Sequence, residues 1–413
     1  MRYAIILSYA LLLSSCTRLS PSAIPFGNSG DASKVRPGSA WLCGQAPSAE
    51  RVRGGVQSDT GNNYESIYKF KAGKDGGYPY DSLTLFDGKL YGTTDEGGSA
   101  GYGTVFEVST SGTERVLYSF KSGKDGAYPC SGLVLVGGKL YGTTQSGGTP
   151  NWGTIFEITT SGSERVVYAF KAGSDGAAPY SGLLALNGKL YGTTVEGGAK
   201  GWGTLFETTT TGPAHVLYSF KAGKGDGGYP YGTLLNVNGA LFGTTQQGGE
   251  AGWGTVFSAS TAGKERLIYS LKAGSDGGYP FDGVTNLNGK LYGTAKYGGA
   301  AGYGVVFSIT TSGQERVVYS FKGGGDGAYP YARLLALNGA LYGTTQSGGT
   351  PSGWGTVFRI DTSGKETVLY RFKAGTDGAS PFSRLIAFNG RLYGTTEGGG
   401  VNGGWGTIFS ISP

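Results

Sequence analysis

Residues 114–163 have the sequence ERVLYSFKSGKDGAYPCSGLVLVGGKLYGTTQSGGTPNWGTIFEITTSGS, and this stretch decides the fold. Four segments in it, residues 114–120, 133–136, 139–144 and 154–159, have the apolar patterns of β-strands. Gly137-Gly138 joins the second and third segments as a two-residue hairpin turn, where most other repeats have Asn-Gly. Two longer Gly-rich loops and one short turn supply the remaining connections. The stretch therefore predicts four antiparallel strands.

The same pattern occurs seven times along the chain. Its Asp-Gly pairs recur every 50 or 51 residues, and they begin at Asp75, Asp125, Asp175, Asp226, Asp276, Asp326 and Asp377. Seven units of four strands predict an all-β, seven-bladed β-propeller with four antiparallel strands per blade. A parallel β-helix is disfavoured because its coils are shorter and lack two-residue hairpins, and a sandwich would not keep this period.

The two ends of the repeat region complement each other. Residues 64–70 form an Arg-Val-Leu-Tyr-Ser-Phe-type strand without a preceding partner, and residues 406–411 form a fourth strand without a successor. We expect the N-terminal strand to complete the last blade, which removes two free sheet edges. The pattern leaves open which strand of each blade lies nearest the propeller axis.

Composition excludes several other classes of protein. Gly accounts for 81 of 413 residues, but it does not recur at every third position, so collagen is excluded. Aromatic residues make up 13% of the chain, far more than in a disordered sequence. The net charge of +6 arises from 34 basic and 28 acidic residues that are interleaved, so a nucleic-acid partner is not indicated.

The N-terminus has the pattern of an export signal. Arg2 precedes an apolar run at residues 4–13 that is too short to span a bilayer. Leu13-Ser14-Ser15-Cys16 resembles a bacterial lipobox, which predicts a lipoprotein signal peptide at residues 1–15 and lipidation of Cys16. Ordinary cleavage near the same site, with release of a soluble protein, is the alternative. Residues 16–62 then form a flexible tether, and residues 63–413 form the propeller.

Two further cysteines remain in the mature chain, Cys43 and Cys130. A disulfide between them would suit an oxidising compartment. The alternative is that Cys130 is simply a small buried hydrophobic residue, since it occupies a position where the other repeats have Tyr or Phe.

The repeat motifs resemble a known family. Leu-Tyr-Gly-Thr-Thr-x-x-Gly-Gly, Gly-(Trp/Tyr)-Gly-Thr-x-Phe and Asp-Gly-x-x-Pro-(Tyr/Phe) are similar to the GloVer tandem repeat of choice-of-anchor proteins, over roughly residues 64–413. The resemblance implies an extracytoplasmic repeat domain and no assigned activity. Members of the family have different anchoring signals; this chain is expected to differ from those with a C-terminal anchor, and Cys16 would take that role.

Candidate ligand-binding residues fall on one face of the predicted propeller. Connections alternate between the two ends of a blade, so both long loops of every blade share one face, which we call the long-loop face, and the short turns share the other, the tight-turn face. Each second long loop has one aromatic residue, and we call this set the loop aromatics: Tyr102, Trp152, Trp202, Trp253, Tyr303, Trp354 and Trp405. They could stack on sugar rings, but packing between blades is the favoured interpretation.

Few residues break the sevenfold symmetry. Lys296, Tyr297, Arg333 and Arg384 replace smaller or uncharged residues on the long-loop face, and they are further candidates for ligand binding. No carboxylate pair, Ser-His-Asp set or His-rich metal cluster accompanies them, so we predict no catalytic residue, metal or cofactor. The Asp of each Asp-Gly pair is expected to bond nearby backbone amides instead of binding Ca²⁺.

These patterns predict a monomeric binding or scaffold module of the bacterial cell envelope. It would face the periplasm or the cell exterior, contact the membrane only through its lipid anchor, and bind a protein or a glycan. The alternative is a carbohydrate-active enzyme with its site on the long-loop face.

Overall fold

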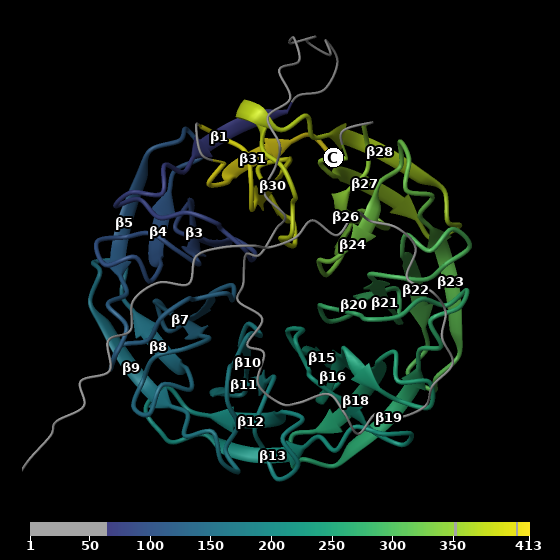
Figure 1. The fold of residues 1–413 in the computed structure, drawn as a ribbon, viewed down its shortest axis with the longest axis horizontal. Coiled ribbons are helices and arrows are strands. Elements are labelled where there is room, and N and C mark those ends of the chain that lie inside the picture. The colour runs from purple at the N-terminus through teal and green to yellow at the C-terminus, as the bar shows by residue number, and fades with distance from the viewer. Residues whose placement is uncertain (1–63, 351–352, 402–403) are drawn as a thin grey trace, which may run out of the picture. The chain divides into compact units, whose positions relative to one another are not determined.

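The computed structural model describes residues 64–350, 353–401 and 404–413. They form seven four-stranded antiparallel sheets arranged around a common axis (Figure 1). The prediction of an all-β, seven-bladed propeller is confirmed. No helix in these ranges is long and apolar enough to cross a membrane.

Each blade has four strands, counted from the axis outward. The innermost strands are β2 (Thr84–Phe86), β6 (Val134–Val136), β10 (Leu184–Leu186), β15 (Leu235–Val237), β20 (Thr285–Leu287), β25 (Leu335–Leu337) and β29 (Ile386–Phe388). The second strands are β3 (Lys89–Thr94), β7 (Lys139–Thr144), β11 (Lys189–Thr194), β16 (Ala240–Thr245), β21 (Lys290–Ala295), β26 (Ala340–Ser347) and β30 (Arg391–Thr396). The third strands are β4 (Thr104–Val108), β8 (Thr154–Ile158), β12 (Thr204–Thr208), β18 (Thr255–Ser260), β22 (Val305–Ile309), β27 (Thr356–Asp361) and β31 (Thr407–Ile411). The outermost strands are β5 (Glu114–Ser119), β9 (Glu164–Ala169), β13 (His215–Ser219), β19 (Glu265–Ser270), β23 (Glu315–Ser320), β28 (Glu366–Arg371) and β1 (Glu65–Lys69).

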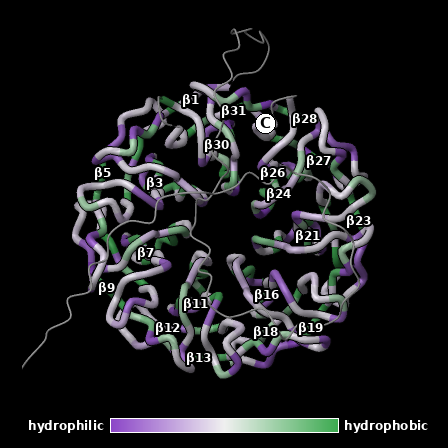
Figure 2. Tube along the Cα trace, in the orientation of Figure 1, coloured by the Kyte–Doolittle hydropathy of each residue, from purple (hydrophilic) through white to green (hydrophobic). Residues whose placement is uncertain are grey.

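The radial order settles which strand lies nearest the axis. Figure 1 places β5, β9, β13 and β19 at the outside of the ring, so the three-residue strands at the opposite edge of each sheet are innermost. Short extra strands, β14 (Gly227–Gly228), β17 (Gln247–Gly248) and β24 (Ala328–Pro330), and a 3-10 turn, η2 (Gly375–Asp377), lie in the long loops. Hydrophobic residues follow the strands, and hydrophilic residues are frequent along the outer edge (Figure 2).

The ring closes as the sequence predicts. β1 pairs with β31, with Glu65 opposite Ser410 and Lys69 opposite Thr407, and the last sheet has the order β1-β31-β30-β29. Tyr64 stacks on Tyr370 of the neighbouring blade, with 3.9 Å between ring centroids. The N-terminal strand therefore completes the seventh blade and contacts the sixth.

The core lies between blades. Phe120, at the end of an outermost strand, meets Phe156 of the next blade edge-to-face at 5.1 Å, and both rings are fully buried. The glycine of each Leu-Tyr-Gly-Thr-Thr strand makes room for this aromatic layer, because a Cβ on Gly92 would lie 2.6 Å from the Phe106 ring. The repeated Gly and Phe therefore have a packing function.

Candidate functional site

Both long loops of a blade lie on the same face, as the alternation of connections predicts. β14 and β17 pair across the two loops of one blade, with Gly227 opposite Gly248. Isolated bridges join the corresponding loops elsewhere, for example between Gly77 and Glu96. The Tyr of the first loop adopts a positive φ, which is 56° at Tyr78. Its backbone N–H donates to the Trp405 carbonyl at 2.9 Å, so the interlocked loops form a rigid surface.

The loop aromatics lie against the next long loop. Trp202 and Tyr229 have ring centroids 4.9 Å apart, and a Cβ on Gly228 would lie 3.1 Å from the Trp202 ring. Trp253 and Trp405 make the equivalent contacts, each 5.0 Å from a tyrosine ring. Trp152 and Tyr303 are more exposed, at 42% and 37%. The geometry favours the packing interpretation, and a ligand-binding role for these seven residues stays a prediction.

The repeated aspartates organise their own loops. Asp75 Oδ2 accepts hydrogen bonds from the Lys71 backbone N–H at 3.0 Å and from the Tyr68 hydroxyl at 2.9 Å. All seven Asp-Gly pairs make both bonds. The structural interpretation of these residues is confirmed.

A glutamate from the next blade lies beside five of these aspartates. Glu114 Oε2 is 3.3 Å from the same Tyr68 hydroxyl that bonds Asp75. Burial, and then the charge of Asp75, raise the pKa of Glu114 to about 7. The equivalent glutamates have the same raised pKa of about 7, and they are Glu164, Glu265, Glu315 and Glu366. Five interfaces between blades thus contain a pair of neighbouring carboxyl groups, and at four of them, those of Glu114, Glu164, Glu265 and Glu315, both groups bond one tyrosine.

A second set of aromatic residues surrounds the propeller axis. We call it the axial ring, and it consists of the residue after proline in each Asp-Gly loop: Tyr80, Cys130, Tyr180, Tyr231, Phe281, Tyr331 and Phe382. Neighbouring rings are in contact from Tyr180 through to Tyr80, with centroids 4.1 to 5.6 Å apart. Side chains at the same repeat position of consecutive blades can contact one another only where the blades come closest together, which is at the axis. The six aromatic members are half-buried as whole residues. Burial raises the pKa of the four tyrosines Tyr80, Tyr180, Tyr231 and Tyr331, so their hydroxyls are shielded from solvent.

Sequence analysis did not select the axial ring as a site. The available signal was that an aromatic residue follows the proline of the Asp-Gly loop in six of the seven repeats. Cys130 interrupts the ring, is 4% exposed and is disulfide-bonded. Cys43, for which the sequence left a disulfide with Cys130 open, and the predicted lipidation residue Cys16 both lie outside the described residues.

Lys296 lies over the axial ring. Its Nζ donates to the Tyr331 hydroxyl at 2.9 Å and lies 4.5 Å from the centroid of that ring. It is also 5.3 Å from Phe281 and 5.1 Å from Tyr297, so three rings surround the ammonium group. Burial lowers the pKa of Lys296 to about 8. Tyr297 remains 39% exposed.

Arg333 and Arg384 lie two residues before the innermost strands β25 and β29 of two adjacent blades. Arg333 is 7% exposed, and its Nε donates to Thr285 Oγ1 at 3.1 Å. Burial and the nearby charge of Arg384 lower the pKa of Arg333 to about 10. The Nε of Arg384 is buried and has no hydrogen-bond partner among the described residues. Of the four symmetry-breaking candidates, the structure therefore places Lys296 on the axial ring and Tyr297 against Lys296. Arg333 and Arg384 lie near each other, two residues after the ring members Tyr331 and Phe382.

Two aspartates that sequence analysis missed lie next to these arginines. Asp282 accepts backbone hydrogen bonds from Gly283 at 2.6 Å and from Arg333 at 3.0 Å. Asp81 accepts a backbone bond from Gly132 at 2.6 Å, and burial together with Asp282 raises the pKa of Asp81 to about 6. Other blades have Ser, Gly or Ala at this position. The blade-specific acids were therefore visible in the sequence.

Two more acids follow the Leu-Tyr-Gly-Thr-Thr strands. Asp95 and Glu397 are each 2% exposed and belong to adjacent blades. Burial raises the pKa of Glu397 to about 7, and burial and the charges of Glu96 and Glu397 raise that of Asp95 well above its usual range. They occupy the same repeat position as Lys296, where other blades have Gln or Val, and alignment of the repeats would have selected them.

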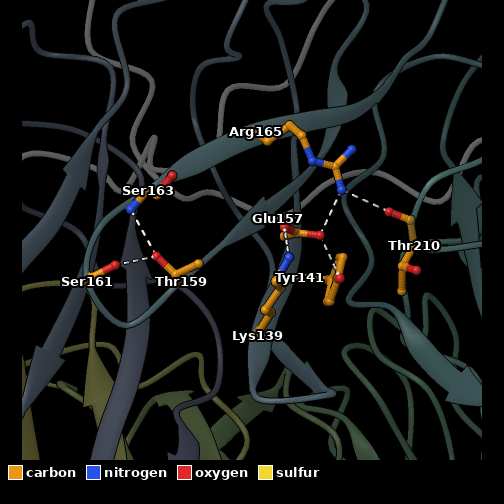
Figure 3. Close-up of polar contacts among 8 residues, drawn as sticks. All are labelled: Lys139, Tyr141, Glu157, Thr159, Ser161, Ser163, Arg165 and Thr210. Carbon is orange, nitrogen blue, oxygen red and sulfur yellow. Dashed lines mark hydrogen bonds and ion pairs between the residues drawn. The ribbon is translucent and has the colours of Figure 1, made fainter.

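Among the described residues, several cations of the tight-turn face, in contrast, form ion pairs with a glutamate. Glu157 contacts Lys139 at 2.6 Å and Arg165 at 2.7 Å, and Arg165 also donates to the Thr210 carbonyl of the next blade (Figure 3). Burial by itself raises the pKa of Glu157. Hydrogen bonds from Lys139, Tyr141 and Arg165 outweigh this effect and lower the pKa to about 2. These ion pairs connect strands and blades.

The fold and the interlocked loops define a repeat-built propeller with one rigid, aromatic-rich face. A family model described as the Gloeobacter/Verrucomicrobia repeat matches residues 54–235, 165–350 and 317–413, and the chain belongs to this family. A search of curated proteins found no match.

Solved structures with low sequence identity are also similar to this chain. A gluconolactonase from Xanthomonas campestris is 13% identical, with a TM-score of 0.38, over 63% of this chain and 81% of that chain. A Bacteroides thetaiotaomicron protein of unknown function is 11% identical, with a TM-score of 0.46, over 85% and 76%. A puromycin-hydrolyzing peptidase from Mycobacterium tuberculosis is 11% identical, with a TM-score of 0.38, over 81% and 60%. We transfer no activity from these proteins.

Proposed function

We propose that this chain is a binding module of the bacterial cell envelope whose long-loop face binds glycans at the axial ring. The observation that carries the proposal is the ring itself, in which six half-buried aromatic side chains contact one another around the axis. Aromatic faces stack on the apolar C–H faces of sugars, and tyrosine hydroxyls supply hydrogen bonds. Interlocked loops hold the ring rigid, which reduces the entropy lost on binding.

The cellular location is part of the proposal. The lipobox at Leu13-Ser14-Ser15-Cys16 would place the chain on an envelope membrane, and residues 16–62 would separate the propeller from the lipid. A surface module of this kind needs no catalytic group.

A carbohydrate-active enzyme is the second candidate, and the carboxyl groups of Asp95 and Glu397 favour it. A general acid in glycoside hydrolysis needs a raised pKa, which both side chains have. Each is only 2% exposed, however, so a substrate cannot reach either group without rearrangement of the loops. Binding therefore remains the preferred function.

The test is a glycan array followed by calorimetry on the full chain. Replacement of the axial Tyr231 by Ala is expected to weaken glycan binding by about 1–3 kcal/mol, by analogy with the loss of one stacking platform. Val401→Ala, which removes exposed apolar surface outside both the axial ring and the loop aromatics, is the control and is expected to bind normally. Unchanged binding by Tyr231→Ala would contradict the proposed site. Cleavage of a bound glycan that is lost in Glu397→Gln would instead establish the enzyme.

A further inference from the structure

Three cations near the axis have no acidic partner within ion-pair distance among the described residues. Lys296 bonds the Tyr331 hydroxyl, Arg333 Nε bonds Thr285 Oγ1, and Arg384 Nε has no partner. On the tight-turn face, Lys139 and Arg165 share one glutamate. The three cations near the axis therefore lack the shared carboxylate that Lys139 and Arg165 have.

The two arginines are specific to their blades. The other five blades have small residues at this position, and these are Ser82, Gly132, Gly182, Thr233 and Gly283. Residues at this repeat position in neighbouring blades lie close together, since a Cβ on Gly132 would lie 2.6 Å from Ser82 Oγ. Arg333 and Arg384 occupy successive places in the same series, and they directly follow the axial-ring segment that contains Tyr331 and Phe382.

Nearby acids do not neutralise these arginines by direct pairing. The oxygens of Asp282 accept from the backbone N–H groups of Thr233, Gly283 and Arg333, and no ion pair joins Asp282 to a guanidinium in the described residues. Arg333 is nevertheless 93% buried, being 7% exposed. Asp282 and Asp81 act on the Arg333 guanidinium only by their charge, without pairing with it. Burial of a guanidinium without a paired anion is unfavourable, so the arrangement is suited to a ligand that brings one.

We propose that the half-buried Arg384 binds the carboxylate of an acidic sugar whose ring stacks on the axial ring, while the buried Arg333 next to it and Lys296 on the ring add positive charge. This inference rests on the proposed function, because the axial ring supplies the sugar contact. The guanidinium of Arg384 matches a planar carboxylate, to which one arginine can donate two parallel hydrogen bonds. The ligand class is therefore a glycan that contains uronic acid.

The experiment measures the melting temperature of the full chain with glucuronate or glucose. A ligand that binds only the native state raises the melting temperature. We expect glucuronate to raise it and glucose, which has the same ring without the carboxylate, to have a much smaller effect. Arg384→Gly introduces the residue that three other blades have at this position, and it should reduce glucuronate affinity at least tenfold. Lys200→Ala removes one exposed positive charge from the same face away from this position, and it should leave the affinity unchanged.

The outcomes separate this inference from the proposed function. Equal effects of glucose and glucuronate, or an unchanged response in Arg384→Gly, would overturn the carboxylate site. Glycan binding on the array without any preference for acidic sugars would overturn the site and leave the binding module standing. A response to glucuronate that requires Arg384, without glycan binding on the array, would keep the anion site and overturn the module. If Arg384→Gly fails to fold, Arg384→Gln applies the same criteria.

Discussion

At the scale of single residues, the tryptophans of the long-loop face illustrate packing between blades. Trp202 lies against Gly228 and Tyr229 of the following loop, whereas Trp152 is 42% exposed. The two positions are equivalent in the repeat and differ in environment. The same substitution should therefore have different costs at the two sites.

We predict that Trp202→Ala lowers the free energy of unfolding by about 2–3 kcal/mol, somewhat less than for a fully buried aromatic residue. Trp152→Ala should cost about 1 kcal/mol or less. Denaturant unfolding of both variants measures the difference. If neither variant loses stability and Trp202→Ala binds glycans more weakly, Trp202 would be a ligand platform instead.

At the scale of elements, the closing strand has the largest consequence. β1 contributes the outermost strand of the seventh blade, and Phe70 beside it is fully buried. Its removal would expose both the edge of β31 and apolar surface in the ring.

We therefore predict that deletion of residues 64–70 lowers the melting temperature substantially and promotes association between chains. Differential scanning calorimetry and size-exclusion chromatography measure the two effects. Lys69→Ala, which leaves the β1 backbone intact, is the control. An unchanged melting temperature and a monomeric elution volume for the deletion would refute the closure.

The N-terminal segment is a separate element with its own prediction. Cys16→Ala should abolish acylation and membrane association, because two acyl chains on one residue provide stable anchoring. Cys43→Ala should retain both properties. Metabolic labelling with a fatty acid and membrane fractionation provide the test, and a Cys16→Ala protein that stays entirely in the membrane fraction would disprove the lipobox.

At the scale of the whole molecule, five interfaces between blades contain a glutamate whose pKa is raised to about 7. A folded-state pKa above the unfolded value means that the native state binds more protons between the two values. The stabilising contribution of these groups is therefore complete below about pH 4.5 and is lost as the pH rises through about 7.

We predict that the melting temperature falls between about pH 5 and pH 8, a decrease to which Glu397 also contributes. Glu315→Gln, which imitates the protonated side chain, should make this dependence shallower. Glu65→Gln, at an exposed position of β1, should leave it unchanged. A melting temperature that rises steadily over this range would contradict the proposed origin of the effect.

The sequence by itself determined the propeller, because its evidence is local and repeated. Asn-Gly turns, apolar strands and a fixed period specify each blade without knowledge of its neighbours, and the unpaired strands at residues 64–70 and 406–411 specify the closure. The alternation of connections along each blade likewise predicted that both long loops lie on one face. The bonds of the Asp-Gly aspartates are also local, which is why they were predictable.

Only the tertiary structure decided which residues form the candidate site. Tyr331, Lys296 and Arg384 are separated by tens of residues, and they converge because the innermost ends of the blades meet at the axis. Burial was equally invisible in the sequence, since it arises from neighbouring blades. It separates Trp152 from Trp202, and it raises the pKa of Glu397. Each blade is specified by its own residues, whereas the site consists of contacts between blades.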